Sequence, residues 1–179
     1  MDPIQLGDKH FVPYISEEKI SAAVKNVANA INMDYDGKHP LFLVVLNGSF
    51  LFAADLVRSV KLNCEVSFVK LASYEGTSSS GTVKELIGLN ESIAGRDVII
   101  VEDIVDTGNT IAQLVEQLLK REPASLRIAS LLLKPEVYKK QIPVDYVGLR
   151  IPNDFIVGYG LDYNGLGRNL RDIYVIRNQ

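Results

Sequence analysis

The sequence predicts an α/β fold with a mostly parallel central sheet flanked by helices. Unbroken apolar runs that suit buried strands alternate with segments whose apolar residues recur at helical spacing. Two of these runs end in short polar turns, at residues 46–49 and 102–110, and each turn leads directly into a predicted helix. Because ligands of open α/β sheets bind at the carboxyl ends of the strands, these turns are the first candidates for a functional site.

The first half of the chain predicts a helix followed by a strand–helix–strand unit. Apolar residues over 20–31 recur at helical spacing, and Ser16 is suited to cap the amino end of that helix. Residues 41–46 are all apolar, which is typical of a strand buried on both faces. The segments that follow predict a helix over 50–60 and a strand over 65–71.

The second half continues this alternation. Residues 97–101 predict the strand before the acidic turn, because they continue an apolar run into it. Apolar residues over 111–119 recur at helical spacing and predict the helix after the turn. Further apolar runs predict strands over 126–133 and 145–149.

Residues after 150 predict a small subdomain. Two short strand-like runs, at 155–160 and 173–176, stand among many glycines, and with the N-terminal residues they could build a hood over the sheet edge. At 179 residues the chain is long enough for one domain with a good core. We therefore predict a single domain over 1–179, with a core over about 16–150 and a hood formed by the N-terminal residues and about 151–179.

Composition and charge exclude several classes of protein. The formal net charge is −3, so nothing indicates a nucleic-acid-binding surface. The sequence shows no signal peptide and no apolar run of spanning length, which predicts a cytoplasmic protein without a membrane partner. The single cysteine, Cys64, cannot form an internal disulfide, and His10 and His39 stand isolated without metal-ligand spacing.

The stretch over 102–110 has the chemistry of a sugar-phosphate site. We expect Glu102 and Asp103 at the carboxyl end of the strand, and the small polar residues in the loop and first turn of the next helix. These small polar residues provide backbone N–H groups, two hydroxyls and the positive end of a helix, which together favour a phosphate. These residues are Thr107, Gly108, Asn109 and Thr110. Glu102 and Asp103 would repel a phosphate, but their carboxylates suit a diol or a divalent cation. A phosphate beside a cis-diol describes a ribose 5-phosphate, whereas two acids alone would also suit an ordinary strand–turn–helix.

This turn resembles the phosphoribosyl-diphosphate (PRPP) motif of the type I phosphoribosyltransferases. Its residues in this chain are Glu102-Asp103-Ile104-Val105-Asp106-Thr107-Gly108-Asn109-Thr110. Four further segments agree in order and spacing with one group of that family, the hypoxanthine (hypoxanthine-guanine) phosphoribosyltransferases. They are residues 45–50, 71–74, 130–134 and 152–163. The resemblance covers nearly the whole chain and implies the fold of that family, which includes a hood.

The resemblance assigns the ribose phosphate side of the site. It implies that Asp106 is the catalytic residue, a general base or proton relay beside N7 of the purine. Glu102 and Asp103 would hold the ribose hydroxyls and Mg²⁺, and Asp162 would be a further metal ligand. The 5′-phosphate would be bound by Asp106, Thr107, Gly108, Asn109 and Thr110.

The resemblance also assigns the pyrophosphate of PRPP to a loop made of Asn47, Gly48 and Ser49, and to Arg168. The family often has a non-proline cis peptide in this loop, which here would join Leu46 to Asn47. Many relatives carry lysine where this chain has Asn47, so the loop keeps its backbone N–H donors but lacks that charge. Considered alone, Arg168 in such a polar segment would be an ordinary surface charge.

A purine pocket and a lid are implied in the same way. Lys134 would donate to O6 of a 6-oxopurine, Phe155 would stack on the purine ring, and the main chain at Ile156 would bind its edge. Ser73 and Tyr74 would lead a lid that closes over PRPP and excludes water. Without the resemblance, Lys134 would be a solvated lysine at a strand end and Phe155 an ordinary core residue.

The implied activity belongs to purine salvage. Hypoxanthine, and guanine as a second base, would react with PRPP to give IMP or GMP and pyrophosphate. Mg²⁺ would be the cofactor, and the enzyme would form a homodimer or homotetramer. Two alternatives stay open: an enzyme that prefers xanthine, and a non-catalytic regulator that senses PRPP, because fold alone does not determine function. A nucleic-acid-binding regulator should have a basic face or an added domain, and the sequence shows neither.

Overall fold

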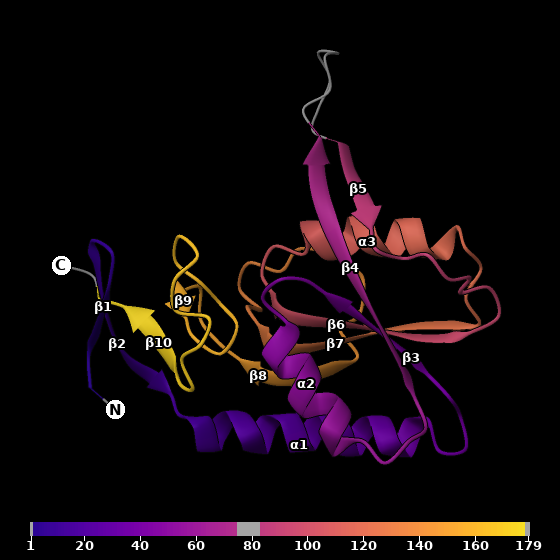
Figure 1. Ribbon diagram of the computed structural model, residues 1–179, viewed down its shortest axis with the longest axis horizontal. Coiled ribbons are helices and arrows are strands. Elements are labelled where there is room, and N and C mark those ends of the chain that lie inside the picture. Colours follow the sequence, from indigo (N-terminus) through magenta and orange to yellow (C-terminus); the bar gives the residue numbers. More distant parts are fainter. Residues whose placement is uncertain (1, 75–82, 178–179) are drawn as a thin grey trace.

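The computed structural model describes residues 2–74 and 83–177, and for 72–74 and 83–87 it describes the backbone alone. The described strands form two sheets, and the larger has six strands in the order β5-β4-β3-β6-β7-β8 (Figure 1). Strands β4, β3, β6, β7 and β8 are parallel, whereas β5 is antiparallel to β4, so the predicted mostly parallel sheet is confirmed. Their bounds are β3 Leu41–Val45, β4 Glu65–Tyr74, β5 Val83–Ile87, β6 Asp97–Val105, β7 Ser125–Leu133 and β8 Tyr146–Arg150.

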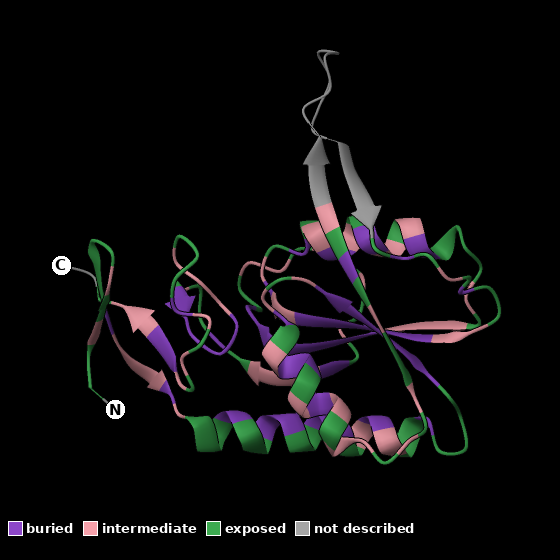
Figure 2. Cartoon of the chain, viewed as in Figure 1, coloured by how far each residue is buried: buried purple, intermediate pink, exposed green. Residues whose placement is uncertain are grey.

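The helices of the described chain cover both faces of this sheet. Helices α1 (Glu17–Asp34) and α2 (Phe50–Ser59) pack on one face, and α3 (Asn109–Leu119) packs on the other (Figure 1). Side chains along a strand alternate between the two faces. Phe42 of β3 therefore lies in the core with α1 and α2, whereas Leu43 lies in the core with α3. Figure 2 shows buried residues concentrated in the strands and exposed residues on the outer sides of the helices.

The smaller sheet joins the two ends of the chain. It is antiparallel, with the order β1-β2-β10-β9, and lies at one end of the molecule beside both termini (Figure 1). Its strands are β1 Ile4–Leu6, β2 Lys9–Ile15, β9 Ile156–Val157 and β10 Ile173–Ile176. Phe11, Val157 and Tyr174 form its small core. We use the name hood for this sheet together with the connecting residues 158–172.

Some strand bounds differ from the expected ones. The strand predicted over 97–101 continues to Val105, because its pairing with β7 extends as far as Val105 opposite Leu133. Glu102 and Asp103 therefore lie near the carboxyl end of the strand, as the sequence predicted. Strand β4 continues to Tyr74 because β5, which the sequence did not predict, pairs with it. In contrast, β9 is much shorter than the predicted 155–160.

The amino end and the buried face of α1 agree with the sequence pattern. Ser16 is its N-cap, and the Ser16 side chain accepts a hydrogen bond of 3.4 Å from the backbone N–H of Lys19, as expected. Six apolar residues of α1 are buried, namely Ile20, Ala23, Val24, Val27, Ala28 and Ile31. No helix within residues 2–74 and 83–177 is both long and apolar enough to cross a membrane.

Candidate active site

The turn between β3 and α2 is the predicted pyrophosphate loop. The peptide bond from Leu46 to Asn47 is cis, as the resemblance implied. Ser49 is fully buried, and its hydroxyl donates a hydrogen bond to the carbonyl oxygen of Val45, so this side chain is engaged within the loop. The loop therefore offers backbone N–H groups and the exposed Asn47 side chain to a ligand, and not the Ser49 hydroxyl.

Gly48 of this loop lies directly against the acidic pair of β6. A Cβ atom added to Gly48 would lie 1.6 Å from Oδ2 of Asp103, so no larger residue fits without moving the carboxylate. Residues 55 positions apart in the sequence thus meet because β3 and β6 are neighbouring parallel strands. The contact places the predicted pyrophosphate loop beside the predicted ribose and metal ligands.

Glu102 and Asp103 concentrate negative charge in a nearly dry place. Glu102 is only 6% exposed, and burial raises its pKa well above the ordinary value, with the adjacent Asp103 carboxylate as the second cause. Burial also raises the pKa of Asp103, although the N–H of Ile104 and the positive charge of Arg168 lower it in part. One buried and one half-buried carboxylate side by side repel each other, and a divalent cation with oxygen preference would relieve the repulsion. This donor set fits Mg²⁺.

Asp162, the third predicted metal ligand, is engaged elsewhere. One of its carboxylate oxygens lies 2.6 Å from Nη2 of Arg168, and the other accepts a hydrogen bond of 2.7 Å from the N–H of Gly165. Within the described residues no group of three or more His, Cys, Asp or Glu side chains is placed to hold a metal ion. The structure therefore does not bring Glu102, Asp103 and Asp162 together as one protein-only metal site.

Arg168 is held beside the predicted pyrophosphate loop through its contact with Gly160. Its Nη1 donates a hydrogen bond of 2.6 Å to the carbonyl oxygen of Gly160. A Cβ added to Gly160 would lie 2.0 Å from the carbonyl oxygen of Gly48, so the hood segment packs tightly on the pyrophosphate loop. The predicted pyrophosphate residues, Asn47 to Ser49 and Arg168, thus lie on two segments that contact one another.

Lys134 and Asp106, which the sequence analysis assigned to different tasks, form an ion pair. Their atoms Nζ and Oδ2 are 3.1 Å apart, and Lys134 is only 7% exposed. The Lys134 ammonium also donates a hydrogen bond of 3.2 Å to Oδ1 of Asn153. The sequence did not predict a role for Asn153, because nothing in an exposed Asn after a proline indicates that it lies beside Lys134. These contacts hold a buried positive charge in place at the carboxyl end of β7.

Two adjoining hollows meet at Ile104 and Asp106, which line both of them. The larger, of about 200 Å³, lies between the sheet edge and the hood. It is lined by Asp103, Ile104, Asp106, Lys134, Asp154, Phe155, Ile156, Leu161, Asp162 and Arg168. The smaller, of about 90 Å³, is lined by Glu102 and residues 104–111. The predicted purine residues therefore gather in one hollow, and the predicted phosphate residues gather in the other.

An aromatic cluster holds Phe155 at the larger hollow. The ring centroid of Phe155 lies 6.3 Å from that of Phe11 and 6.0 Å from that of Tyr163, the second pair being edge-on at 86°. Phe155 nevertheless remains 46% exposed, which is uncommon for a large apolar side chain with such support. Tyr163 is itself fixed by a hydrogen bond of 2.7 Å to Oδ1 of Asp8. A supported but exposed ring is suited to stack on a planar ligand.

The phosphate turn ends where α3 begins. Gly108 is the N-cap of α3, and because glycine has no side chain it cannot itself cap the first N–H groups of the helix. Thr107 and Asn109 are exposed, so these N–H groups face an open hollow. Uncapped N–H groups at a helix amino end form an anion site. The predicted lid residues Ser73 and Tyr74 end β4, but their side chains and the loop 75–82 lie outside the described residues.

Comparison with known proteins first gives the class of protein. The family model for the phosphoribosyl transferase domain matches residues 15–164, which include the whole six-stranded sheet, the three helices and every residue that lines the two hollows except Arg168. The chain therefore belongs to the phosphoribosyltransferase family of enzymes, and the family recognised from its motifs is confirmed.

Individual relatives show to which group within that family the chain belongs. The hypoxanthine-guanine phosphoribosyltransferase of Lactococcus lactis is 42% identical, over 91% of this chain and 89% of that protein. The one from Streptococcus mutans is 43% identical, over 90% and 91%. A solved hypoxanthine-guanine phosphoribosyltransferase from Bacillus anthracis has a TM-score of 0.83 with 38% identity, over 93% of this chain and 97% of that chain. The group is that of the hypoxanthine-guanine phosphoribosyltransferases.

Proposed function

We propose that this enzyme transfers the 5-phosphoribosyl group of PRPP to hypoxanthine and to guanine, giving IMP or GMP and pyrophosphate, in purine salvage. The names of its relatives support this reaction. The single observation that carries the proposal is the pair of adjoining hollows that meet at Asp106. One offers helix N–H groups to a phosphate, and the other offers a buried lysine and an exposed aromatic ring to a base.

The purine would bind in the larger hollow. Lys134 has only hydrogen-bond donors, so it suits the carbonyl O6 of a 6-oxopurine and not the exocyclic amine of adenine. Its present partners, Asp106 and Asn153, hold the ammonium in place before the base arrives. Phe155 would stack on the ring, and the backbone of Ile156 on β9 would bind the purine edge.

PRPP would extend across β6 from the phosphate turn to the pyrophosphate loop. The 5′-phosphate would occupy the N–H groups at 107–110, and the ribose hydroxyls would lie against Glu102 and Asp103. The pyrophosphate would take the loop N–H groups at Gly48 and Ser49 and the guanidinium of Arg168. Because Arg168 already has Asp162 as a partner, it would be shared between that carboxylate and the leaving group.

Transfer would then depend mainly on positioning and electrostatics. The bond from C1′ to the pyrophosphate oxygen would break as the bond from C1′ to the purine nitrogen forms, through a state with positive charge on the sugar. Asp106 would accept the proton that the base loses. Ser73 and Tyr74 would lead the lid that keeps water away from the sugar.

Glu102 and Asp103 would hold a divalent cation. Mg²⁺ in this place would neutralise the leaving pyrophosphate. Magnesium sites commonly combine one or two carboxylates with substrate phosphates, so a third protein ligand is not required. Asp162 would join Glu102 and Asp103 only by giving up a contact with Arg168 or with the Gly165 N–H.

We also propose that the enzyme assembles as a homodimer or homotetramer. Three apolar side chains on α2 and β4 remain substantially exposed: Phe50 at 39%, Val66 at 40% and Phe68 at 49%. Large apolar side chains that remain exposed are candidates for burial between subunits.

One assay tests the proposed reaction. Purified protein is mixed with PRPP and Mg²⁺, and nucleotide formation is compared for hypoxanthine, guanine, xanthine and adenine. We expect turnover with hypoxanthine and guanine. Fastest turnover with xanthine would instead support the xanthine-preferring alternative. PRPP binding without nucleotide from any base would support the regulator.

A further inference from the structure

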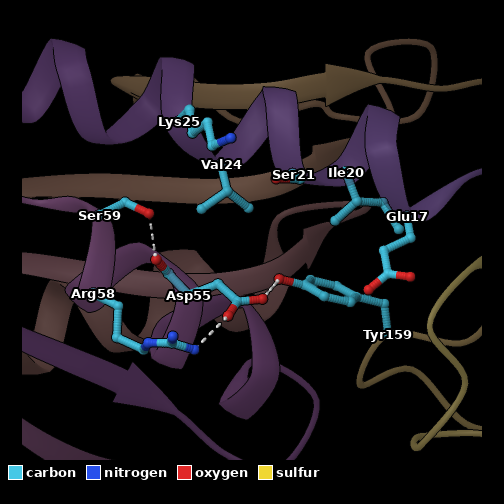
Figure 3. Close-up of a pocket in the computed structure, with 9 residues that line it drawn as sticks. All are labelled: Glu17, Ile20, Ser21, Val24, Lys25, Asp55, Arg58, Ser59 and Tyr159. Carbon is cyan, nitrogen blue, oxygen red and sulfur yellow. Dashed lines mark hydrogen bonds and ion pairs between the residues drawn. The ribbon is translucent and has the colours of Figure 1, made fainter.

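A side-chain hydrogen bond joins the hood to the helix that follows the predicted pyrophosphate loop. The hydroxyl of Tyr159 donates to Oδ2 of Asp55 on α2, at 2.6 Å (Figure 3). Tyr159 is only 8% exposed, and its ring lies at the edge of a cavity of about 350 Å³ between α1 and α2. Neither Tyr159 nor Asp55 lines the two hollows of the candidate active site.

Tyr159 and Asp55 lie next to the two segments that would bind pyrophosphate. Helix α2 starts at Phe50, immediately after Ser49, so Asp55 is rigidly connected to the loop. Tyr159 directly precedes Gly160, which packs against the Gly48 carbonyl with no room for a Cβ. The hydrogen bond and the glycine contact therefore dock the hood on the strand–loop–helix unit at two neighbouring points.

Gly160 in turn is bound to Arg168 in both directions. The N–H of Gly160 donates 2.9 Å to the carbonyl oxygen of Arg168, and the carbonyl oxygen of Gly160 accepts 2.6 Å from the Arg168 guanidinium. A displacement of Tyr159 would thus move the Arg168 guanidinium, whose positive charge acts on Asp103 beside the loop.

The backbone at Tyr159 favours such a displacement once the side chain is released. Its φ is 47°, in the left-handed region that residues other than glycine rarely adopt. Such a conformation persists where surrounding contacts hold it. Burial, followed by the hydrogen bond to Asp55, raises the pKa of Tyr159, so the phenol keeps the proton that it donates.

We propose that Tyr159 is a positioning residue for pyrophosphate recognition: through its hydrogen bond to Asp55 it holds Gly160 and Arg168 in register with the loop over 47–49. The inference rests on the proposed function, because it takes that loop and Arg168 as the pyrophosphate site. A purely structural role is the alternative, in which the bond stabilises the fold and leaves ligand binding unchanged.

The chain provides a matched control for the structural alternative. Tyr146 is also buried, and its hydroxyl also donates to an aspartate, Oδ2 of Asp34, at 2.8 Å. Tyr146 is the first residue of β8, so it lies at the opposite end of the parallel sheet from the site. Tyr146→Phe removes the same kind of hydrogen bond, together with the one that this hydroxyl accepts from Arg127 at 2.7 Å, without touching the hood.

The experiment compares Tyr159→Phe, Asp55→Ala, Asp55→Asn and Tyr146→Phe. Titration calorimetry measures pyrophosphate affinity with Mg²⁺, steady-state kinetics give KM for PRPP and for hypoxanthine, and hydrogen exchange follows the Gly160 amide. Tyr159→Phe and Asp55→Ala should weaken pyrophosphate binding and raise KM for PRPP about tenfold, the usual scale for a lost charged hydrogen bond. KM for hypoxanthine should stay constant, and the Gly160 amide should exchange faster.

Asp55→Asn should recover most of the affinity, because an amide oxygen still accepts from the phenol. Combining Tyr159→Phe with Asp55→Ala should cost no more than either change alone. Equal losses of Tm in Tyr159→Phe and Tyr146→Phe, with wild-type pyrophosphate affinity in both, would overturn the inference. A wild-type protein that binds pyrophosphate but forms no nucleotide would refute the proposed reaction only, since calorimetry and exchange do not need turnover.

Discussion

Lys134 and Asp106 neutralise each other across the two hollows, and Arg168 and Asp162 do the same in the hood. Each cation is thus held in place by an acid before a substrate oxygen reaches it, which lowers the entropy lost on binding. Glu102 and Asp103 differ, because the two acids repel each other and the charge of Arg168 offsets this repulsion only in part. Ion pairs, as well as packing, therefore position the side chains that would contact the substrate.

Asp106→Asn should separate chemistry from binding. The amide keeps the size of the side chain but cannot take a proton, and removal of a general base typically lowers the rate about 10²–10⁴-fold. We expect a loss of that order in the forward rate, with PRPP affinity changed little, measured by single-turnover kinetics beside equilibrium binding. An intact chemical step with weakened PRPP binding would mean that Asp106 is a binding residue.

Lys134→Met should lower catalytic efficiency with hypoxanthine by about tenfold or more, because a buried charged donor to O6 is lost. The wild-type enzyme should use adenine poorly or not at all, since its amine would face the ammonium of Lys134. Steady-state kinetics with both bases check this. Lys139→Met is the control, because Lys139 is exposed in the loop after the same strand and should leave efficiency unchanged. Comparable wild-type rates with adenine and hypoxanthine would contradict the assignment.

Elements are held together by contacts distant from the site. At the end of α1, Oδ2 of Asp34 accepts hydrogen bonds from the Tyr146 hydroxyl of β8 and from the Arg127 guanidinium of β7. These contacts join a helix that covers one face of the sheet to two of its strands. They lie at the amino ends of the strands, so they support the fold without shaping the hollows.

Asp34→Asn should make stability less dependent on pH. The hydrogen bond from Tyr146, followed by that from Arg127, lowers the pKa of Asp34 in the folded protein. A lowered folded pKa means stabilisation that is present above the unfolded pKa, about 4, and lost as pH falls through the folded value. The advantage of wild type over Asp34→Asn in free energy of unfolding should therefore shrink as pH falls below about 4.

Urea unfolding across that pH range measures the difference. Asp36→Asn serves as the control, because Asp36 is exposed in the turn after α1. A constant difference between wild type and Asp34→Asn at every pH would show that the Asp34 charge does not contribute.

At the scale of the whole molecule, the site exists only where two sheets meet. The parallel sheet supplies the acids, the predicted phosphate turn and Lys134, whereas the hood supplies Asp162 and Arg168, and Phe155 directly precedes its strand β9. The hood strands come from both ends of the chain, so residues near the two termini jointly define the position of the aromatic ring. PRPP, which carries several negative charges, would bind beside the acids Glu102 and Asp103 in this site.

Activity should therefore require a divalent cation. Without one, Glu102 and Asp103 would repel PRPP, and like charges repel more strongly where water is excluded. We expect turnover to stop after chelation and to return with Mg²⁺ or Mn²⁺. Calorimetry should show weak metal binding to the free protein and stronger binding with PRPP present. Full turnover after exhaustive chelation would refute this dependence.

Local patterns in the sequence were sufficient for much of this protein. Helical spacing and apolar runs predicted α1, α2, α3 and the parallel strands, because these elements bury one stripe or two faces in the same core. The motif around 102–110 identified the family, since a phosphate turn is formed by consecutive residues. The cis bond after Leu46 followed from the same resemblance.

Only the tertiary structure decided how distant residues meet. Lys134 contacts Asp106, Gly48 abuts Asp103, and the Tyr159 hydroxyl reaches Asp55, in each case through the packing of separate elements. The extension of β6 to Val105 and the existence of β5 depended likewise on partner strands. Side-chain partners of this kind are set by the pairing of strands and the docking of the hood, and neither is encoded in local periodicity.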